Sequence, residues 1–279
     1  MPLSLSDLDE DYLTSSTTTD SFALFLRRVA PELLPTTTVD TSVPELSRHG
    51  RTVLAIRCSG GVIAAADLGS AMTRRPNQRD IDRILGTDDR CVTGVAGAAG
   101  LSGEMIRLFQ AEVDHLEKIQ GQRISMDGRA ARLSSLVRSN GTMMAQGMAV
   151  TPLLAGWDDL AHRGRIFSYD GTGGCTEKHA HACVGSGTLF ATDVLNDGYR
   201  PGMDRDEAIM LAIRALHTAI SDNTTSALSG PDLSRGLYPT VAHADSTGVT
   251  RIPTEEVAVL AKRVVDEITA ETEHEEVQS

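Results

Sequence analysis

The sequence contains few aromatic residues and few cysteines, and both shortages limit how the chain can fold. Phe, Trp and Tyr make up 4% of the 279 residues, so the core has to be built from Ala, Val, Leu, Ile and Met. The four cysteines lie far apart along the chain, which in a protein without a secretory signal is typical of reduced core residues rather than a disulfide framework. At this length we expect one large globular domain or two small ones.

Positive charge and long apolar runs are also scarce. The 26 Lys and Arg residues are outnumbered by 38 Asp and Glu residues, and the resulting net charge of −12 argues against nucleic acid as a partner. No apolar run approaches the roughly 18 residues that a membrane span needs. The acidic N-terminus lacks the basic segment followed by an apolar one that is typical of a secretory signal. The sequence therefore predicts a cytoplasmic protein that binds neither nucleic acid nor membrane.

One segment combines the residue types of a zinc site, in the order Cys175, His179, His181 and Cys183. Gly173-Gly174 predicts a hairpin turn just before it, and alternation would then place the odd-numbered positions on one face of a strand from 175 to 184. At about 3.3 Å per residue the two cysteines would be roughly 26 Å apart, too far to share one ion. A strand with semi-polar side chains is therefore favoured, and neither a metal nor another cofactor is expected.

From Thr52 onward, short β-prone runs and amphipathic stretches succeed one another in groups. Strands are predicted at 52–57, 61–67, 91–96, 150–157, 164–170, 175–184, 237–245 and 249–252. Helical periodicity predicts helices at 102–120, at 127–148, after residue 204 and at 254–269, followed by an acidic tail that frays from about residue 270. Because strands and helices are grouped rather than strictly alternating, the pattern favours an antiparallel layered α+β fold with the helices outside.

Local signals refine this reading. Ser59-Gly60 predicts a hairpin, and Asp204 with Glu207 predicts a capping pair at the start of a helix. Gly141 and Gly147 inside the helix predicted at 127–148 would each cost about 1 kcal/mol relative to Ala, which indicates close packing against a neighbour.

The first fifty residues differ from the rest because they are rich in Ser, Thr and Pro. A single apolar segment at 21–34 predicts a short amphipathic helix with Phe22, Phe25, Leu26 and Val29 on one face, ending near Pro31. This composition is typical of an extension docked on another part of a structure rather than of a domain.

Several runs, taken in their order along the chain, resemble one family. They are His49-Gly50 before a β run, Gly60-Gly61-Val62 leading to Ala65-Ala66-Asp67, Gly97 before a helix, VTPLLAGWD at 150–158, Val184-Gly185-Ser186-Gly187-Thr188, and Gly230-Pro231-Asp232-Leu233 followed by Arg235-Gly236. Together they resemble the β subunit of the actinobacterial 20S proteasome, from about Ser21 to Ala261. The run at 25–35 resembles that family's propeptide.

The resemblance implies a four-layer αββα sandwich, the N-terminal nucleophile hydrolase fold, for residues 51–279, with residues 1–50 as a propeptide. It implies heptameric β rings stacked between α rings, with other β subunits (self or a paralogue) as neighbours and a ring ATPase or activator reached through the α rings. In this family the propeptide is removed by self-cleavage after the His-Gly pair. The exposed threonine then attacks peptide carbonyls, activated by its own α-amine, whose pKa near 8 suits a proton acceptor.

The sequence departs from the family at the decisive position. Cleavage in the family's pattern would fall between Gly50 and Arg51, and Arg51 stands where the family has its nucleophilic threonine. Arginine has no hydroxyl and cannot attack a carbonyl, so both catalysis and self-cleavage should be lost. Thr52 matches the family's second residue, and its hydroxyl would lie on the opposite face of the strand.

Of the residues that would support the nucleophile, some match the family and others do not. Asp67 matches the family's aspartate, although without the family it reads equally well as a turn residue. Gly69 replaces a basic residue, and Arg83 stands at the lysine position, a change that loses a compact and tunable ammonium group. In a run of alternating charges, Arg83 reads first as part of a solvated face.

Three further positions complete the predicted site. Gly97 matches the glycine whose N–H forms the oxyanion hole, and a backbone donor survives changes of side chain. Ser186 matches a supporting serine, but a Gly-Ser-Gly sequence is more often a tight turn. In the loop at 225–230 the family's aspartate is absent, and Ser229 is the candidate for the supporting hydroxyl.

Two functions from different classes follow, with a third behind them. The favoured one is a catalytically silent β-type subunit. The alternative is an active threonine endopeptidase in which another protease trims the chain after Arg51 and Thr52 becomes the nucleophile, at the cost of a register shift that unseats Val53 and Ala55. A free-standing hydrolase that acts outside the proteasome is the third reading.

Overall fold

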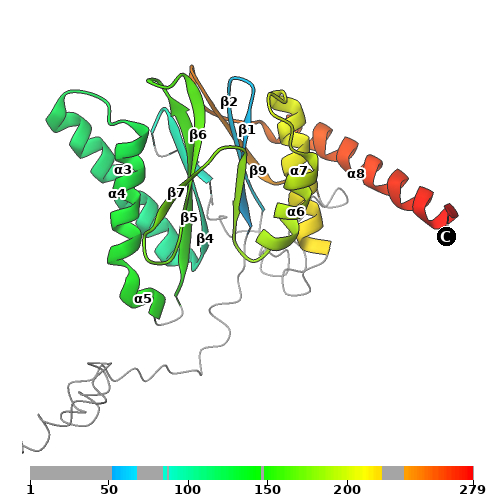
Figure 1. Ribbon diagram of the computed structural model, residues 1–279, viewed down its shortest axis with the longest axis horizontal. Helices are drawn as coiled ribbons and strands as arrows, with labels where there is room; N and C mark the ends of the chain where they lie inside the picture. Colours follow the sequence, from blue (N-terminus) through cyan, green and yellow to red (C-terminus); the bar gives the residue numbers. More distant parts are fainter. Residues whose placement is uncertain (1–51, 68–83, 87, 146–147, 222–235, 279) are drawn as a thin grey trace, which may run out of the picture. The chain divides into compact units, whose positions relative to one another are not determined.

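Two antiparallel sheets stacked face to face form the centre of the fold (Figure 1). The computed structural model describes residues 52–67, 84–86, 88–145, 148–221 and 236–278, and every structural statement below refers to these residues. The first sheet has the strand order β10-β9-β2-β1-β8, with β1 at Val53–Cys58, β2 at Gly61–Ala66, β8 at His181–Val184, β9 at Thr240–Asp245 and β10 at Gly248–Arg251. The second has the order β3-β4-β5-β6-β7, with β3 at Ile84–Gly86, β4 at Cys91–Gly97, β5 at Val150–Asp158, β6 at Arg163–Tyr169 and β7 at Cys175–Lys178.

Helices cover the outer face of each sheet, which gives four layers. The second sheet is covered by α3 (Ala99–Gln120) and α4 (Met126–Ser139), with the short α5 at Gly141–Ala145. The first sheet is covered by α6 (Thr188–Gly198), α7 (Arg205–Ser221) and α8 (Thr254–Gln278). The α+β sandwich that the sequence predicted is therefore confirmed.

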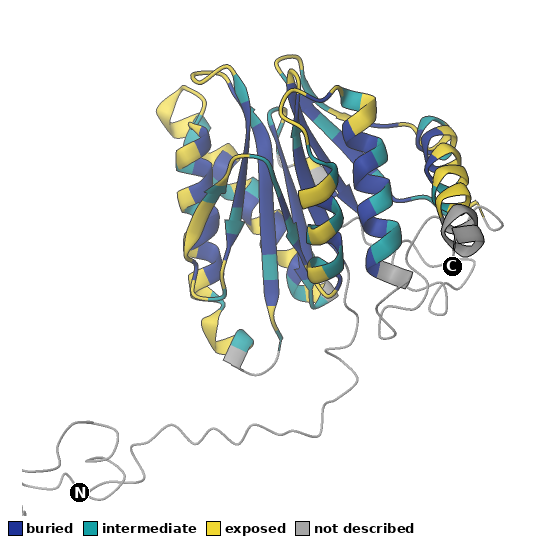
Figure 2. Ribbon diagram, turned by 45° about the vertical axis from the view of Figure 1, so that its right-hand side comes forward, coloured by how far each residue is buried: buried dark blue, intermediate teal, exposed yellow. Residues whose placement is uncertain are grey.

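Apolar side chains pack in three layers: between the first sheet and its helices, between the two sheets, and between the second sheet and its helices. Because side chains alternate along a strand, one strand contributes to two of these layers. In β1, Leu54 and Ile56 pack toward α6, α7 and α8, whereas Val53 and Ala55 pack between the two sheets. The inner strands β1, β2, β4, β5 and β6 are therefore mostly buried on both faces, whereas the edge strands β7 and β10 carry exposed side chains, as do the outer surfaces of the helices and the loops (Figure 2). Each fully buried aliphatic side chain contributes about 1.5–3 kcal/mol to folding, so these layers supply most of the driving force.

The strand predicted at 175–184 is wrong in one respect that matters. It breaks at His179-Ala180 into β7, which pairs with β6 in the second sheet, and β8, which pairs with β1 in the first. The single alternating face on which the zinc argument was based therefore does not exist. In the described part of the chain, no group of three or more His, Cys, Asp or Glu residues is placed to hold a metal ion.

The helix predicted at 127–148 is also corrected. It ends at Ser139, the chain turns at Asn140, and α5 begins at Gly141. A side chain at Gly141 would meet open space, so this glycine marks a break between helices rather than the close packing that the sequence indicated. Gly147 and the N-terminal helix predicted at 21–34 lie outside the described residues.

The C-terminal end and two short elements differ from the sequence reading as well. The tail predicted to fray from about residue 270 continues α8 to Gln278, and Arg214 supports the extension by pairing with Glu267 at 3.0 Å and Glu271 at 2.8 Å. The prediction at 102–120 began α3 three residues late, and neither α6 nor β3 was predicted. The capping pair is confirmed, because Asp204 and Glu207 each accept a hydrogen bond from the backbone N–H of the other.

Candidate functional site

Thr52 directly precedes β1 and Asp67 directly follows β2, and the two residues meet where these paired strands end. The backbone N–H of Thr52 donates to Oδ2 of Asp67 at 2.9 Å, and the backbone N–H of Asp67 donates to the carbonyl of Thr52 at 3.1 Å. The pairing register puts them there, because Val53 lies opposite Ala66 and each residue directly adjoins that pair. Both residues are buried, so a carboxylate is held against the backbone N–H of Thr52 at this end of β1.

The hydroxyl of Thr52 is also engaged. The backbone N–H of Gly187 donates to Thr52 Oγ1 at 3.1 Å, which joins β1 to the turn between β8 and α6. A Cβ atom at Gly187 would lie 2.6 Å from that hydroxyl and 2.7 Å from the Cβ of Ala219 in α7, so the approach requires glycine. Thr52 therefore faces the helix layer, the same side as Leu54 and Ile56.

Ser186, which the sequence assigned as a supporting serine, lies next to Gly187 and is exposed. Gly97 ends β4 in the second sheet, opposite Val150. Its φ is +115°, and a Cβ atom there would lie 2.1 Å from the carbonyl oxygen of Ala149, so only glycine fits. In Figure 1 the starts of β1 and β5 lie at the same, lower end of the sandwich. Thr52 directly precedes β1 and Gly97 pairs with the first residue of β5, Val150, so both belong to this end.

A thiol also lies in this region. Cys183 of β8 pairs with Leu54 of β1, and its thiol is near enough to Asp67 to be affected by the charge of that carboxylate. Burial raises the pKa of Cys183 to about 12, and the negative charge of Asp67 acts in the same direction. At neutral pH the thiol stays protonated, so Cys183 offers no reactive thiolate in place of a hydroxyl nucleophile.

Several predicted site residues lie outside the described part of the chain. They are Gly50, Arg51, Gly69, Arg83 and Ser229. The structure thus brings together Thr52, Asp67 and the turn that contains Ser186, while the roles assigned to the other positions stay predictions.

The comparisons with known proteins identify the family. The family model described as "Proteasome subunit" matches residues 47–229. A protein of Stackebrandtia nassauensis named "Proteasome subunit beta" is 41% identical over 251 residues, covering 88% of this chain and 89% of that protein. The chain belongs to the proteasome subunit family.

Two further proteasome relatives agree with this assignment. A "Proteasome subunit beta" of Rhodococcus erythropolis is 42% identical and covers 90% of this chain and 89% of its own length. One from Rhodococcus jostii is 39% identical and covers 94% of both chains. The chain is therefore a β-type proteasome subunit, as the ordered runs in its sequence indicated, and the two-sheet sandwich described above is the proteasome fold.

Sequence reasoning about this proteasome subunit missed the role of Gly187. The Gly-Ser-Gly run drew attention to its serine, whereas the structure shows that the second glycine makes the contact with Thr52. No local signal pointed to this contact, because the helix that follows Gly187 was not predicted and Thr52 lies 135 positions away. None of the helices in the described part of the chain combines the length and hydrophobicity that a membrane span requires.

Proposed function

We propose that this chain is a catalytically silent β-type subunit of a 20S proteasome core particle, retaining residues 1–50. The observation that carries the proposal is Arg51, which follows His49-Gly50 directly and occupies the position of the family's threonine nucleophile. An arginine side chain has five N–H donors and no hydroxyl, so it can neither attack a peptide carbonyl nor cleave the preceding bond. The whole core particle degrades proteins, and this subunit contributes structure to it.

The contacts of Thr52 support a catalytically silent subunit rather than the alternative, an active peptidase that uses Thr52 as its nucleophile after trimming. Its hydroxyl accepts a hydrogen bond from Gly187 and faces α7, and its backbone N–H is bound to the carboxylate of Asp67. If trimming made this nitrogen an α-ammonium, the adjacent carboxylate would raise its pKa above the usual value near 8. An amine held protonated is a poor proton acceptor, which is the role this chemistry requires of it.

The remaining features of the proposal follow from the family. The subunit would stand in heptameric rings with copies of itself or with an active paralogue, between α rings through which a ring ATPase or activator acts. Its location would be cytoplasmic, with no nucleic acid or membrane as partner. A native mass of the purified complex, with the subunits identified by mass spectrometry, tests this part because a free-standing hydrolase would run as a monomer or small oligomer without α-type subunits.

The decisive experiment is the intact mass of the chain isolated from its own cells. We expect residues 1–50 to be attached and fluorogenic peptides to remain uncleaved. A mass that begins at Thr52, together with covalent labelling of that residue by a β-lactone or boronate probe and peptide hydrolysis, would establish the trimmed peptidase instead.

Substitution of Arg51 tests whether the rest of the site can still support self-cleavage. Arg51→Thr should restore cleavage after Gly50 if Arg83 can replace the family's lysine, and Arg51→Val is the matched control because it removes the arginine without adding a hydroxyl. Processing of both variants would show that the hydroxyl at residue 51 is not the agent of cleavage, which contradicts the proposal.

A further inference from the structure

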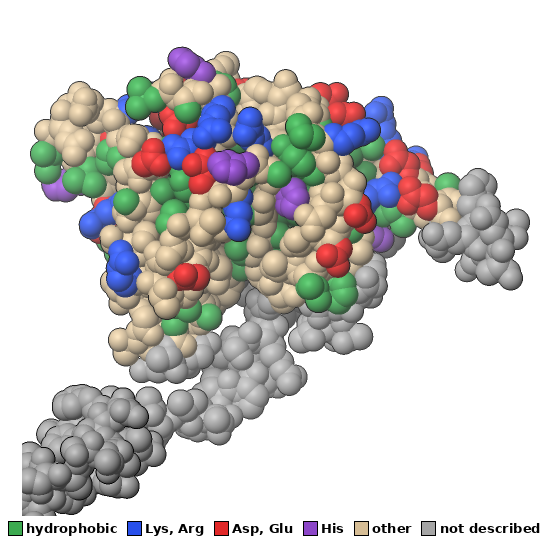
Figure 3. All heavy atoms as spheres, viewed as in Figure 1, with side chains coloured by type: hydrophobic (Ala, Val, Ile, Leu, Met, Phe, Trp, Pro, Cys, Tyr) green, Lys and Arg blue, Asp and Glu red, His purple; other side chains and the backbone are tan. Residues whose placement is uncertain are grey.

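A hollow of about 480 Å³ lies at the opposite end of the sandwich from Thr52. It is formed where the β1–β2 hairpin, the β5–β6 hairpin, the β7–β8 link and the loop between α6 and α7 come together. From Thr52 to Arg57 the strand β1 rises by about 3.3 Å per residue, so roughly 16 Å of strand separates the two regions. In Figure 3, Lys, Arg and His side chains lie together with Asp and Glu side chains over the upper part of the molecule.

The lining of the hollow is positively charged, whereas the chain as a whole is negatively charged. The lining includes Arg57, Arg163, His162 and His179, and none of the lining residues is Asp or Glu, although the whole chain carries a net charge of −12. The nearest carboxylate, Glu177, is shared between Arg163 and Arg165, so the two guanidinium groups of the lining outnumber the carboxylates that reach them. A concave region with such an excess of positive charge attracts anions.

The two arginines are weakly paired. Within the described residues, the guanidinium of Arg57 makes no ion pair, and its hydrogen bond is to the carbonyl of His179 at 3.4 Å. Arg163 reaches Glu177 at 3.3 Å, but Glu177 is held more closely by Arg165, which donates to its two oxygens at 3.0 and 2.7 Å. Both guanidinium groups therefore have donors left for a ligand.

The frame around the hollow is fixed. Oδ1 of Asp158 accepts hydrogen bonds from the backbone N–H groups of Leu160 and Ala161, at 2.9 and 3.0 Å, and this turn brings His162 to a φ of +46°. Such a backbone conformation is costly for a residue other than glycine, and it is kept here by the turn and by Arg165, which binds Oδ2 of Asp158 at 2.8 Å. A site with a preset frame loses less conformational entropy on binding.

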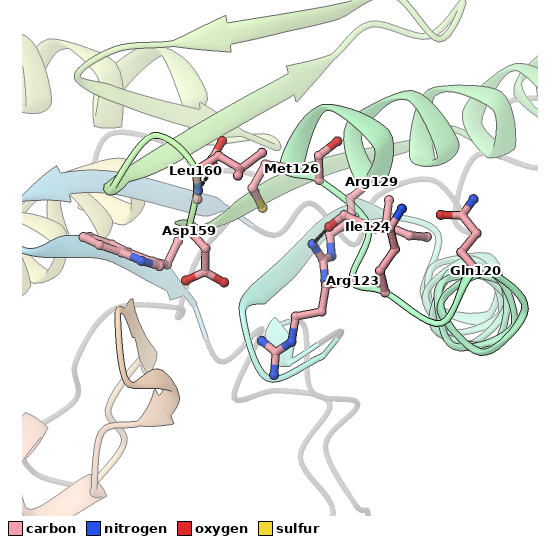
Figure 4. A pocket seen from close by; sticks show the side chains of 11 residues that line it. Gln120, Arg123, Ile124, Met126, Arg129, Asp159 and Leu160 are labelled. Atoms are coloured by element: carbon pink, nitrogen blue, oxygen red, sulfur yellow. Dashed lines mark hydrogen bonds between the residues drawn. The ribbon is translucent and has the colours of Figure 1, made fainter.

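The neighbouring hollow provides a contrast on the same face of the molecule. It measures about 550 Å³, shares Trp157 with the first hollow, and lies between the α3–α4 loop and the β5–β6 hairpin (Figure 4). Its lining contains Asp158 and Asp159, and its buried Arg129 is bound to Asp88 at 2.6 Å and to Glu117 at 2.8 Å. The positive charges of this second hollow are therefore already balanced by carboxylates.

We propose that the first hollow binds a small multivalent anion of the phosphoryl class, with Arg57 and Arg163 as its paired cationic contacts and His162 and His179 as further donors. Guanidinium groups match phosphoryl oxygens in geometry and bind them through two parallel hydrogen bonds. The ligand is either a free inorganic polyphosphate or the phosphate tail of a nucleotide, and its binding does not depend on whether the subunit is silent.

Titration of the full-length protein with inorganic tripolyphosphate tests the proposal. Trp157 is the single tryptophan of the chain and lines both hollows, so its fluorescence reports binding in either one. Arg57→Gln and Arg163→Gln should each weaken binding about tenfold, because a lost hydrogen bond to a charged group costs about that much. Arg123→Gln is the matched control, since it removes an arginine that lines only the second hollow.

Each outcome decides the matter. Saturable binding that falls in the Arg57 and Arg163 variants and is unchanged in the Arg123 variant supports the site. Binding lost equally in all three variants, binding lost only with Arg123→Gln, or no fluorescence change and no heat of binding at millimolar tripolyphosphate overturns it. If ATP binds more tightly than tripolyphosphate in the same titration, the ligand is a nucleotide, and equal or weaker binding of ATP identifies a free polyphosphate.

Discussion

The two ends of the sandwich are held together by different interactions. At one end, the backbone N–H of Thr52 donates to the carboxylate of Asp67, and its hydroxyl accepts from the backbone N–H of Gly187. At the other end, Arg165 binds three carboxylates from separate elements, Asp127 of α4, Asp158 of β5 and Glu177 of β7, at 2.7 to 2.8 Å. The first end should therefore respond to the loss of a hydroxyl or a gain in volume, and the second to charge and pH.

The largest expected effect comes from breaking the charged end. Arg165→Met removes the cationic partner of Asp158, whose side chain is only 7% exposed, and leaves that buried charge with only the backbone N–H groups of Leu160 and Ala161 as partners. Losing one partner of a buried pair costs about 3–5 kcal/mol, so the free energy of unfolding measured in urea should fall by about that amount. Adding Asp158→Asn should recover part of the loss, and a double variant as unstable as the single one would contradict this account.

A smaller effect is expected at the end that contains Thr52. Thr52→Val keeps the shape of the side chain but leaves the buried N–H of Gly187 without its acceptor, which costs about 1–3 kcal/mol. Thr52→Ser keeps the acceptor and should lose less than about 1 kcal/mol. Urea denaturation of the two variants checks the prediction, and equal stabilities would show that the hydroxyl does not hold the turn.

The dependence on pH should separate the two ends. Hydrogen bonds from Arg165 hold the pKa of Glu177 and of Asp127 below their usual values, and although burial opposes it, the same arginine and two N–H groups hold the pKa of Asp158 low. These carboxylates stabilise the fold above their unfolded pKa values near 4, and the contribution disappears as the pH falls through the lower folded values.

The urea midpoint should accordingly decline between about pH 5 and pH 2. Arg165→Met should flatten this decline, whereas Thr52→Val should shift the curve down without changing its slope. An unchanged slope in the Arg165 variant would exclude the three carboxylates as its source.

The smallest effect is expected at Arg57. The side chain is partly exposed and has no carboxylate partner in the described residues, so Arg57→Gln should change the free energy of unfolding by less than about 0.5 kcal/mol. A thermal or urea melt checks this, and a loss comparable to that of Arg165→Met would mean that Arg57 belongs to the framework of the charged end rather than to a ligand site.

The sequence predicted the layers well and the connections less well. Buried β-prone runs such as those at 52–57 and 150–157 show their character locally, and the capping pair at Asp204 depends on neighbours only three residues apart. The passage from β7 to β8 could not be read in this way, because the residues on both sides of His179 favour extended backbone and only tertiary pairing decides to which sheet each belongs.

The candidate site shows the same limit. The positions of Thr52 and Asp67 follow from alternation and from a short hairpin, both of which are visible in the sequence. The contact with Gly187 joins residues 135 positions apart, and no local pattern specifies it. The residue that determines the proposed silence, Arg51, needed no structure at all, because the absence of a hydroxyl is a matter of composition.

The short link at His179-Ala180 has a mechanical consequence. It ties an edge strand of one sheet covalently to an edge strand of the other, so that flank acts as a closed hinge. On the opposite flank the sheets are joined by weaker links such as the hydrogen bond from Val249 to the carbonyl of Asp89, at 3.0 Å. Any breathing of the sandwich should therefore begin at β10, and amide hydrogens there should exchange with solvent before those of β8.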